Sequence, residues 1–246
     1  MKKILIILVA LTVMLPLFAC SVKSVHENQT RQSKQVQLLK KNRKAWEKEI
    51  ADADVIQSDV LRDESTYVGT TLNQLKNHNQ ALIKGTIVNL EKMHSPKNRA
   101  YTKATIHIDK VLSGDKTLQN KSYFVALNGG VVSFDRWYAN MSKPKDFDHK
   151  MLIKHDEFPL PDIGSEIITG LMPIHLDEPL EYNTALKQSG FTIKNSFAID
   201  GAKYNFWVKD SKTKKYQLNN PTVKKADKQL ARELDKLTNK INQKYN

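Results

Sequence analysis

The segment YTKATIHIDKVLSG, residues 101–114, indicates which kind of secondary structure dominates the chain. Apolar and polar side chains alternate along its middle, so that each kind falls on its own face. The apolar set is Ala104, Ile106 and Ile108, and the polar set is Thr105, His107 and Asp109. A repeat of two residues is that of a β-strand with one buried face. We therefore expect a long strand here, inside a sheet.

The neighbouring segments predict the other strands of that sheet. ALIKGTIVNL (81–90) is an apolar strand that Gly85 interrupts, where a bulge or bend would fit. Further strands are expected in KSYFVALNGG (121–130) and SEIITGLMPI (165–174), and two or three more within 190–220. Asp200-Gly201 and Asp210-Ser211 are expected to form turns in this last region.

Together these strands resemble a small five-stranded barrel of the OB type found in secreted bacterial proteins. The resemblance rests on the strand broken by glycine, on the long strand that ends in Val-Leu-x-Gly-Asp, and on the Gly-Gly pair after the next strand. It implies a barrel domain over 71–221, with an irregular, charged insertion at 131–163. OB barrels bind oligonucleotides, oligosaccharides or proteins, so the resemblance leaves the ligand open.

Helical patterns flank the strands, and we expect an N-terminal helical region over 34–70 and an amphipathic helix over 222–246. Thr71 is expected to cap a short helix between the first region and the barrel. The fold class is therefore mainly β with flanking helices (α+β), and both long helices are expected to pack on the body. Their stripes follow helical spacings of three and four: Val36, Leu39, Arg43, Trp46 and Ile50 in one, and Ala226, Leu230, Leu234, Leu237, Ile241 and Tyr245 in the other.

The N-terminus has the pattern of a secretory signal. Two lysines follow Met1, and an apolar run then extends over residues 4–19. This run is shorter than the roughly 20 residues that a membrane-spanning helix needs. A cationic start, a short apolar run and small residues before a cleavage site are typical of an export signal.

The run ends in Leu17-Phe18-Ala19-Cys20, which resembles the lipobox of bacterial prolipoproteins. The resemblance implies a signal peptide over 1–19, cleavage between Ala19 and Cys20, and a diacylglycerol thioether on the Cys20 thiol. Residues 20–33 would then be a flexible tether, and the protein would be lipid-anchored on the extracytoplasmic face of the cell membrane. The alternative is that Cys20 is an ordinary apolar residue of a signal or membrane helix.

Cysteine usage agrees with export, because Cys20 is the only cysteine among 246 residues. Exported proteins either pair their cysteines or avoid them. The mature chain would have no disulfide and no cysteine nucleophile.

The net charge of +13 is concentrated at the two predicted flanking helices. Residues 34–50 carry six basic and two acidic side chains, and residues 222–246 carry seven and three. For an exported protein the candidate partners of such basic ends are anionic lipid headgroups or an anionic wall polymer, with no nucleic acid. The alternative is that these are the solvated faces of two helices. Another envelope protein is also a possible partner.

The candidate ligand contacts are aromatic and basic side chains in SFDRWYAN, residues 133–140. Arg136, Trp137 and Tyr138 can stack on sugar rings or bases. The alternative is that they anchor a long loop to the barrel. A second group, Tyr204, Phe206 and Trp207, is expected in the core, with the first two on one face of a strand and Trp207 on the other.

Catalytic motifs are absent from the sequence, and we predict no catalytic residue, no metal site and no cofactor. DFDHKMLIKHDE (146–157) is rich in metal-binding residue types, but its spacing matches no ligand pattern, so a polar surface loop is expected. The resulting prediction is a non-enzymatic binding or interaction module at the cell envelope. The alternatives are a solute-binding lipoprotein of a transporter and a cell-wall hydrolase.

Overall fold

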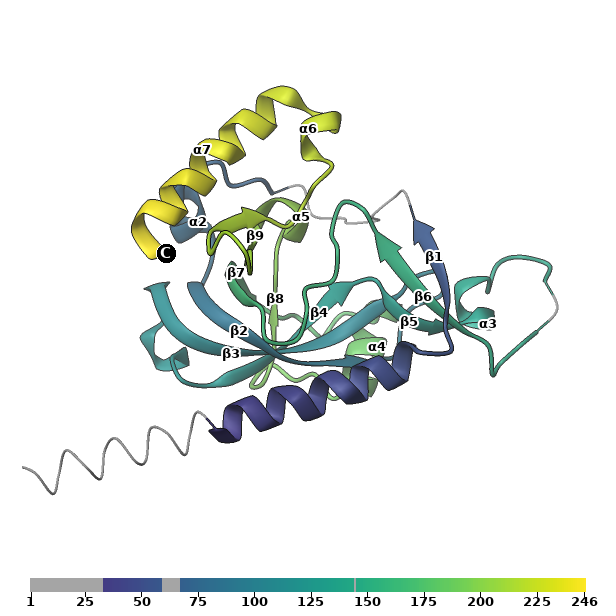
Figure 1. The fold of residues 1–246 in the computed structure, drawn as a ribbon. Coiled ribbons are helices and arrows are strands. Elements are labelled where there is room, and N and C mark those ends of the chain that lie inside the picture. Colours follow the sequence, from purple (N-terminus) through teal and green to yellow (C-terminus); the bar gives the residue numbers. More distant parts are fainter. Residues whose placement is uncertain (1–32, 59–66, 144) are drawn as a thin grey trace, which may run out of the picture. The chain divides into compact units, whose positions relative to one another are not determined.

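The computed structural model describes residues 33–58, 67–143 and 145–246. The predicted signal peptide, Cys20 and nearly all of the tether lie outside these residues. The chain divides into two units, residues 1–41 and 42–246. The described part of the first unit, residues 33–41, is helical, and this helix continues to residue 50 in the second unit (Figure 1). Of the helical region predicted over 34–70, residues 34–50 are therefore helical.

A seven-stranded sheet forms the centre of the second unit (Figure 1). The long strand β2 (Ala81–Lys92) lies in its middle and pairs antiparallel with β3 (Tyr101–Gly114) and β7 (Glu166–Pro173). The order along the sheet is β10-β9-β7-β2-β3-β4, with β8 attached to β7. The remaining bounds are β4 (Ser122–Asn128), β8 (Phe197–Ala198), β9 (Phe206–Lys209) and β10 (Tyr216–Leu218).

The alternation predicted for residues 101–114 is confirmed. Strand β3 has these bounds, and Ala104, Ile106 and Ile108 are all buried while the residues between them are half-exposed. The predicted irregularity at Gly85 is also present, because the register between β2 and β3 shifts between Lys84 and Gly85. A Cβ atom on Gly85 would lie 2.6 Å from the His107 carbonyl oxygen, so this close approach needs glycine.

The sheet is larger than the five strands predicted, and strand pairing does not close it. Within the described residues, one isolated parallel bridge, from Phe124 in β4 to Ser196, links the β4 edge to the chain just before β8. The mixed α+β class is confirmed at this level. The extra strands are short pieces from residues 190–220, where the sequence predicted two or three.

A second sheet of three strands, in the order β1-β6-β5, corrects two predictions. Strand β1 (Asp54–Ser58) lies inside the stretch predicted to be helical, and it pairs parallel with β6 (Lys150–His155). Strand β5 (Gly130–Ser133) and β6 lie in the insertion predicted to be irregular. These strands are four to six residues long, so their own periodicity is weak and they depend on one another.

The shorter helices agree only partly with the sequence patterns. Thr71 caps α2 (Leu72–His78) by accepting a hydrogen bond from the Gln74 N–H, as predicted. Helix α4 (Glu181–Gln188) was not predicted. Tyr204 lies in the short helix α5 (Ala202–Asn205) rather than in a strand, whereas Phe206 and Trp207 are fully buried as predicted. Two further short helices are α3 (Phe134–Trp137) and η1 (Lys116–Leu118).

The C-terminal pattern forms two helices, α6 (Val223–Ala226) and α7 (Lys228–Tyr245). Asp227 separates them and caps α7 by accepting hydrogen bonds from the Gln229 and Leu230 N–H groups. Ala226 therefore falls outside the buried stripe. The rest of the stripe packs on the sheet as expected, with Leu234, Leu237 and Ile241 buried in a cluster that includes Trp207 and Tyr216.

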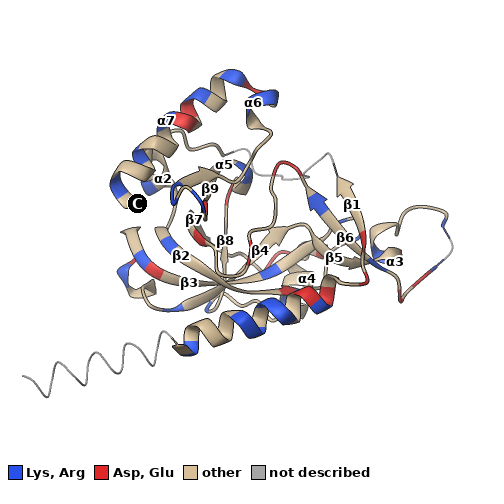
Figure 2. Ribbon diagram, viewed as in Figure 1, with Lys and Arg blue, Asp and Glu red and all other residues tan. Residues whose placement is uncertain are grey.

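Helix α7 contacts the edge of the sheet and also carries an exposed basic face. The Asn242 side chain accepts a hydrogen bond from the Tyr216 N–H (2.7 Å) and donates one to the Tyr216 carbonyl (2.8 Å). It therefore engages the backbone N–H and C=O of Tyr216, in the edge strand β10. The seven basic side chains of residues 222–246 are all exposed, and Figure 2 shows them along α6 and α7. No helix among the described residues is long and apolar enough to span a bilayer.

Candidate functional site

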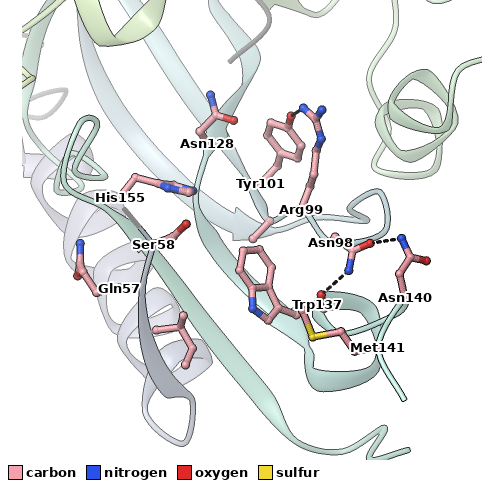
Figure 3. Close-up of a pocket in the computed structure, with 12 residues that line it drawn as sticks. Gln57, Ser58, Asn98, Arg99, Tyr101, Asn128, Trp137, Asn140, Met141 and His155 are labelled. Atoms are coloured by element: carbon pink, nitrogen blue, oxygen red, sulfur yellow. Dashed lines mark hydrogen bonds between the residues drawn. The ribbon is translucent and has the colours of Figure 1, made fainter. Parts of the chain in front are cut away.

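A cavity of about 600 Å³ lies between the three-stranded sheet and the ends of β3 and β4 (Figure 3). One wall comes from β1 and the end of β6, and the opposite wall comes from the chain that enters β3 and from the segment that follows α3. The lining residues are Ile56, Gln57, Ser58, Asn98, Arg99, Ala100, Tyr101, Asn128, Trp137, Asn140, Met141 and His155. Five separate parts of the sequence therefore build this site.

Side-chain contacts at both ends hold the β1 wall in place. The Gln57 amide donates to the Asp156 carboxylate at 2.7 Å. The Asp54 carboxylate lies 2.8 Å from His149 Nε2. Because β1 is also paired parallel with β6 along its whole length, this wall is fixed to the insertion rather than to the large sheet.

Amide side chains hold the opposite wall. Asn98 adopts a left-handed backbone conformation (φ 57°), and its N–H donates to the Arg136 carbonyl oxygen. Its side-chain nitrogen donates to the Trp137 carbonyl at 2.8 Å, and its side-chain oxygen accepts from Asn140 at 2.6 Å, as Figure 3 shows. The rim is thus preformed, which lowers the entropy cost of binding a ligand.

The three predicted ligand contacts separate in the structure. Trp137 lines the cavity and packs partly against the buried cluster that contains Val132 and Met151. Arg136 instead donates to the Ser95 carbonyl and to Glu181, both at 2.7 Å. Anchoring is therefore the main role of Arg136, and Trp137 combines anchoring with a place in the cavity wall.

Tyr138 lies outside the main cavity and, like Arg136, faces a neighbouring hollow of about 370 Å³. Its ring packs against Phe134, with 4.7 Å between centroids, and the Lys143 ammonium lies 4.4 Å from its centroid. Tyr138 also packs on the buried cluster that contains Val132 and Met151 of the three-stranded sheet. Tyr138 thus fits the alternative role of a loop anchor.

His155 is the one imidazole in this lining among the described residues, and 9% of its surface is exposed. Burial lowers the pKa of its imidazole, and this effect outweighs a hydrogen bond with the Ser58 backbone and the nearby charge of Glu157. The imidazole is therefore neutral at pH 7. Within the described part of the chain its Nδ1 atom has no hydrogen-bond partner.

The chemistry of the lining is polar but nearly uncharged. Its amides are Gln57, Asn98, Asn128 and Asn140, which can both donate and accept hydrogen bonds. Arg99 is its one permanent cation, and this guanidinium donates to the Tyr101 hydroxyl at 3.3 Å. Of the residues that the structure describes, no Asp or Glu lines the cavity. This arrangement suits a ligand with hydroxyl or amide groups.

The residues of DFDHKMLIKHDE do not gather into a metal site. His149 lies near Asp146 (3.5 Å) as well as Asp54, but His155 is at the other end of β6. Over residues 33–58, 67–143 and 145–246, no group of three or more His, Cys, Asp or Glu side chains is placed to hold a metal ion. Much of the segment is strand β6 rather than the surface loop that the sequence suggested.

Sequence reasoning found one of the twelve lining residues, Trp137. The asparagines were missed because asparagine is common in turns and gives no sign of which turns meet in space. The sequence offered one signal for this site, namely Asn98 in the loop KMHSPKNRA, because asparagine tolerates the left-handed conformation that the structure shows there. No protein family model matches the sequence, and no curated protein and no solved structure is significantly similar to it.

Proposed function

We propose that this protein is a lipid-anchored lipoprotein of the cell envelope, held by Cys20 on the extracytoplasmic face of the cell membrane. Its folded domain acts as a non-enzymatic binding module, and the cavity beside Trp137 is its ligand site. The observation that carries the binding role is this preformed cavity, whose wall of amides surrounds one aromatic ring. Ligand pockets combine apolar or aromatic surface with fixed polar groups, and Ile56, Trp137 and Met141 supply the apolar surface here.

The composition of the lining supports binding over catalysis. General acid–base chemistry needs two titratable groups with different pKa values, or a nucleophile beside a base. Here the His155 imidazole is hydrogen-bonded to the Ser58 backbone, and the lining that the structure describes contributes no carboxylate that could orient the imidazole as a base. A hydrolase for the cell wall would need paired carboxylates across a cleft.

We also propose that the seven-stranded sheet is an opened and enlarged barrel of the OB type. The strand order supports this. Strands β2, β3 and β4 are consecutive and antiparallel, and β7 pairs with the free side of β2. Strands β8 and β9 in turn pair with β7. The parallel bridge between Phe124 and Ser196 lies where the closing contact of such a barrel would form. The site lies beside β3 and β4.

The anchor is tested by replacing Cys20 with alanine in the full-length chain. We expect the variant to lose labelling by an alkyne fatty acid and to migrate as an uncleaved precursor. A Cys20→Ala variant that is still labelled, or is still cut after Ala19, would contradict the lipoprotein assignment.

The binding role is tested by photo-crosslinking in cells. A benzophenone amino acid replaces Met141, which lines the cavity and is 57% exposed, or Ile193, which is 71% exposed and lies outside its lining. We expect a defined adduct from position 141 and none from position 193. Equal labelling at both positions, or none at position 141, would refute a binding role for the cavity.

A further inference from the structure

A second hollow of about 550 Å³ adjoins the cavity beside Trp137. The two share Arg99, Tyr101 and Asn128 as lining residues. The far wall of the second hollow comes from the chain after β7 and from α4, and includes His175 and Tyr182. A pocket for one small ligand measures roughly 300–1,000 Å³. Each hollow is therefore large enough for one small unit, and the shared residues place the two side by side.

The shared residues form a ridge whose backbone is already paired. Tyr101 and Asn128 are opposite each other in the register of β3 and β4. Figure 3 shows the Arg99 and Tyr101 side chains lying side by side, with Asn128 next to them. Since the strand edges here bond to one another, a ligand that crosses the ridge must contact side chains rather than extend a sheet.

The charges of the two linings exclude strongly charged ligands. Among the described residues that line either hollow, the permanent cations are Lys97 and Arg99, and the one carboxylate is Glu181. Glu181 already accepts hydrogen bonds from Arg136 (2.7 Å) and from the Lys97 N–H (3.1 Å). Two cations are too few for a nucleic-acid strand, whose binding depends on many phosphate contacts. A basic peptide would need more free carboxylates than the linings supply, since Glu181 is already engaged.

The polar groups match a chain of hydroxyl and amide groups. Amide side chains in the first hollow can both donate and accept, as hydroxyl and acetamido groups do. Each hollow also has an aromatic ring, Trp137 in the first and Tyr182 in the second. The Tyr182 ring packs at 5.0 Å against Tyr101 on the ridge. Aromatic faces bind the apolar faces of sugar rings.

We propose that the two hollows are subsites of one groove that binds an uncharged oligosaccharide carrying hydroxyl and acetamido groups, with sugar units on both sides of the ridge. This inference rests on the proposed function, because it names the ligand of the same module. It adds a second subsite to the cavity beside Trp137. The affinity therefore depends on the length of the glycan.

The test is isothermal titration of the lipid-free protein with β-1,4-linked N-acetylglucosamine oligomers of one to six units. We expect the affinity to rise at least about tenfold between one and four units, since a second subsite adds its own contacts. A thymidine oligonucleotide and an uncharged peptide serve as comparison ligands and should bind more weakly. Equal affinity for all glycan lengths, or preferred binding of the oligonucleotide or peptide, would overturn the proposal.

Matched variants assign the subsites. Asn140→Ala should weaken short and long glycans alike by roughly three- to tenfold, the effect of losing one hydrogen bond. His175→Ala should weaken only the long glycans. Asn73→Ala and His94→Ala are the controls, since both side chains are exposed and line neither hollow. If His175→Ala behaves like His94→Ala at every length, the second subsite is refuted.

The ligand class and the proposed function fail in different ways. An adduct at position 141 in cells, together with no binding of any N-acetylglucosamine oligomer in vitro, would overturn the glycan and leave the binding module standing. The absence of that adduct would instead refute the binding module itself.

Discussion

Replacing Leu234 with alanine should lower the stability of the folded unit by about 3 kcal/mol. Leu234 is 1% exposed and lies in the cluster that joins α7 to Trp207 and Tyr216. Truncating a buried leucine typically costs about 2–5 kcal/mol, because the lost transfer energy is added to the cost of the cavity. A domain is stabilised by only about 5–15 kcal/mol, so the loss would be a substantial part of the total.

The assay is thermal unfolding of the chain that begins after Cys20, followed by circular dichroism. For a unit of about 200 residues, 1 kcal/mol shifts the Tm by about 2–4 °C, so the Leu234→Ala variant should melt about 6–12 °C lower. Lys236→Ala is the matched control, because it removes an exposed side chain from the same helix. A Leu234→Ala variant that melts within about 2 °C of the wild type would refute the packing argument. Loss of attachment to anionic vesicles without a change in Tm would identify α7 as a membrane element instead.

Four further predictions concern the pH dependence of two variants, a helix cap and a backbone turn. Burial acts to raise the pKa of Glu166, but hydrogen bonds from Tyr216, Lys209 and Lys84 outweigh it and lower the pKa. Glu166→Gln should therefore destabilise the fold at pH 7, as measured by urea unfolding. The difference in unfolding free energy from the wild type should shrink as the pH falls below about 4.5. Burial raises the pKa of Asp109 above 3.8 despite its hydrogen bond from Thr86, so Asp109→Asn should gain stability relative to the wild type as the pH rises from 3 to 7. Parallel curves for the two variants would contradict one of the two assignments. Asp227→Ala should cost about 1 kcal/mol in urea unfolding through loss of the α7 cap, and an unchanged midpoint would show that the cap is dispensable. Gly130→Ala should lower the Tm more than Gly190→Ala. Both glycines have positive φ, but only a Cβ at 130 would overlap a threonine hydroxyl. Equal shifts in Tm would show that the destabilisation comes from the backbone conformation alone.

The parts of the fold that the sequence predicted are those whose residues carry their own periodicity. Residues 101–114 alternate over a full strand, and the stripe of α7 extends over several turns, so one buried face determined each element. Gly85 was also readable, because a glycine within an apolar strand indicates a close approach of backbone. Thr71 carried a cap signal of its own.

The parts that the sequence did not predict depend on contacts between distant segments. Strand β1 is five residues long and forms on the edge of β6, about 100 positions later in the chain. The cavity beside Trp137 needs this pairing, since β1 supplies one of its walls. Tyr204 was assigned to a strand because its segment is aromatic, yet Gly201 adopts a left-handed conformation before it and starts a helical turn. Such local choices are settled by tertiary packing, which spacing alone does not reveal.

The contact between Asn242 and strand β10 has a consequence for solubility. An unpaired strand edge is a template on which a second chain can add its own strand, and proteins that expose such edges tend to aggregate. By engaging both backbone groups of Tyr216, a single amide from α7 blocks that template at the first residue of the three-residue strand β10. A protease that removed the last helix would therefore do more than weaken the fold. It would uncover a surface on which one molecule recruits the next.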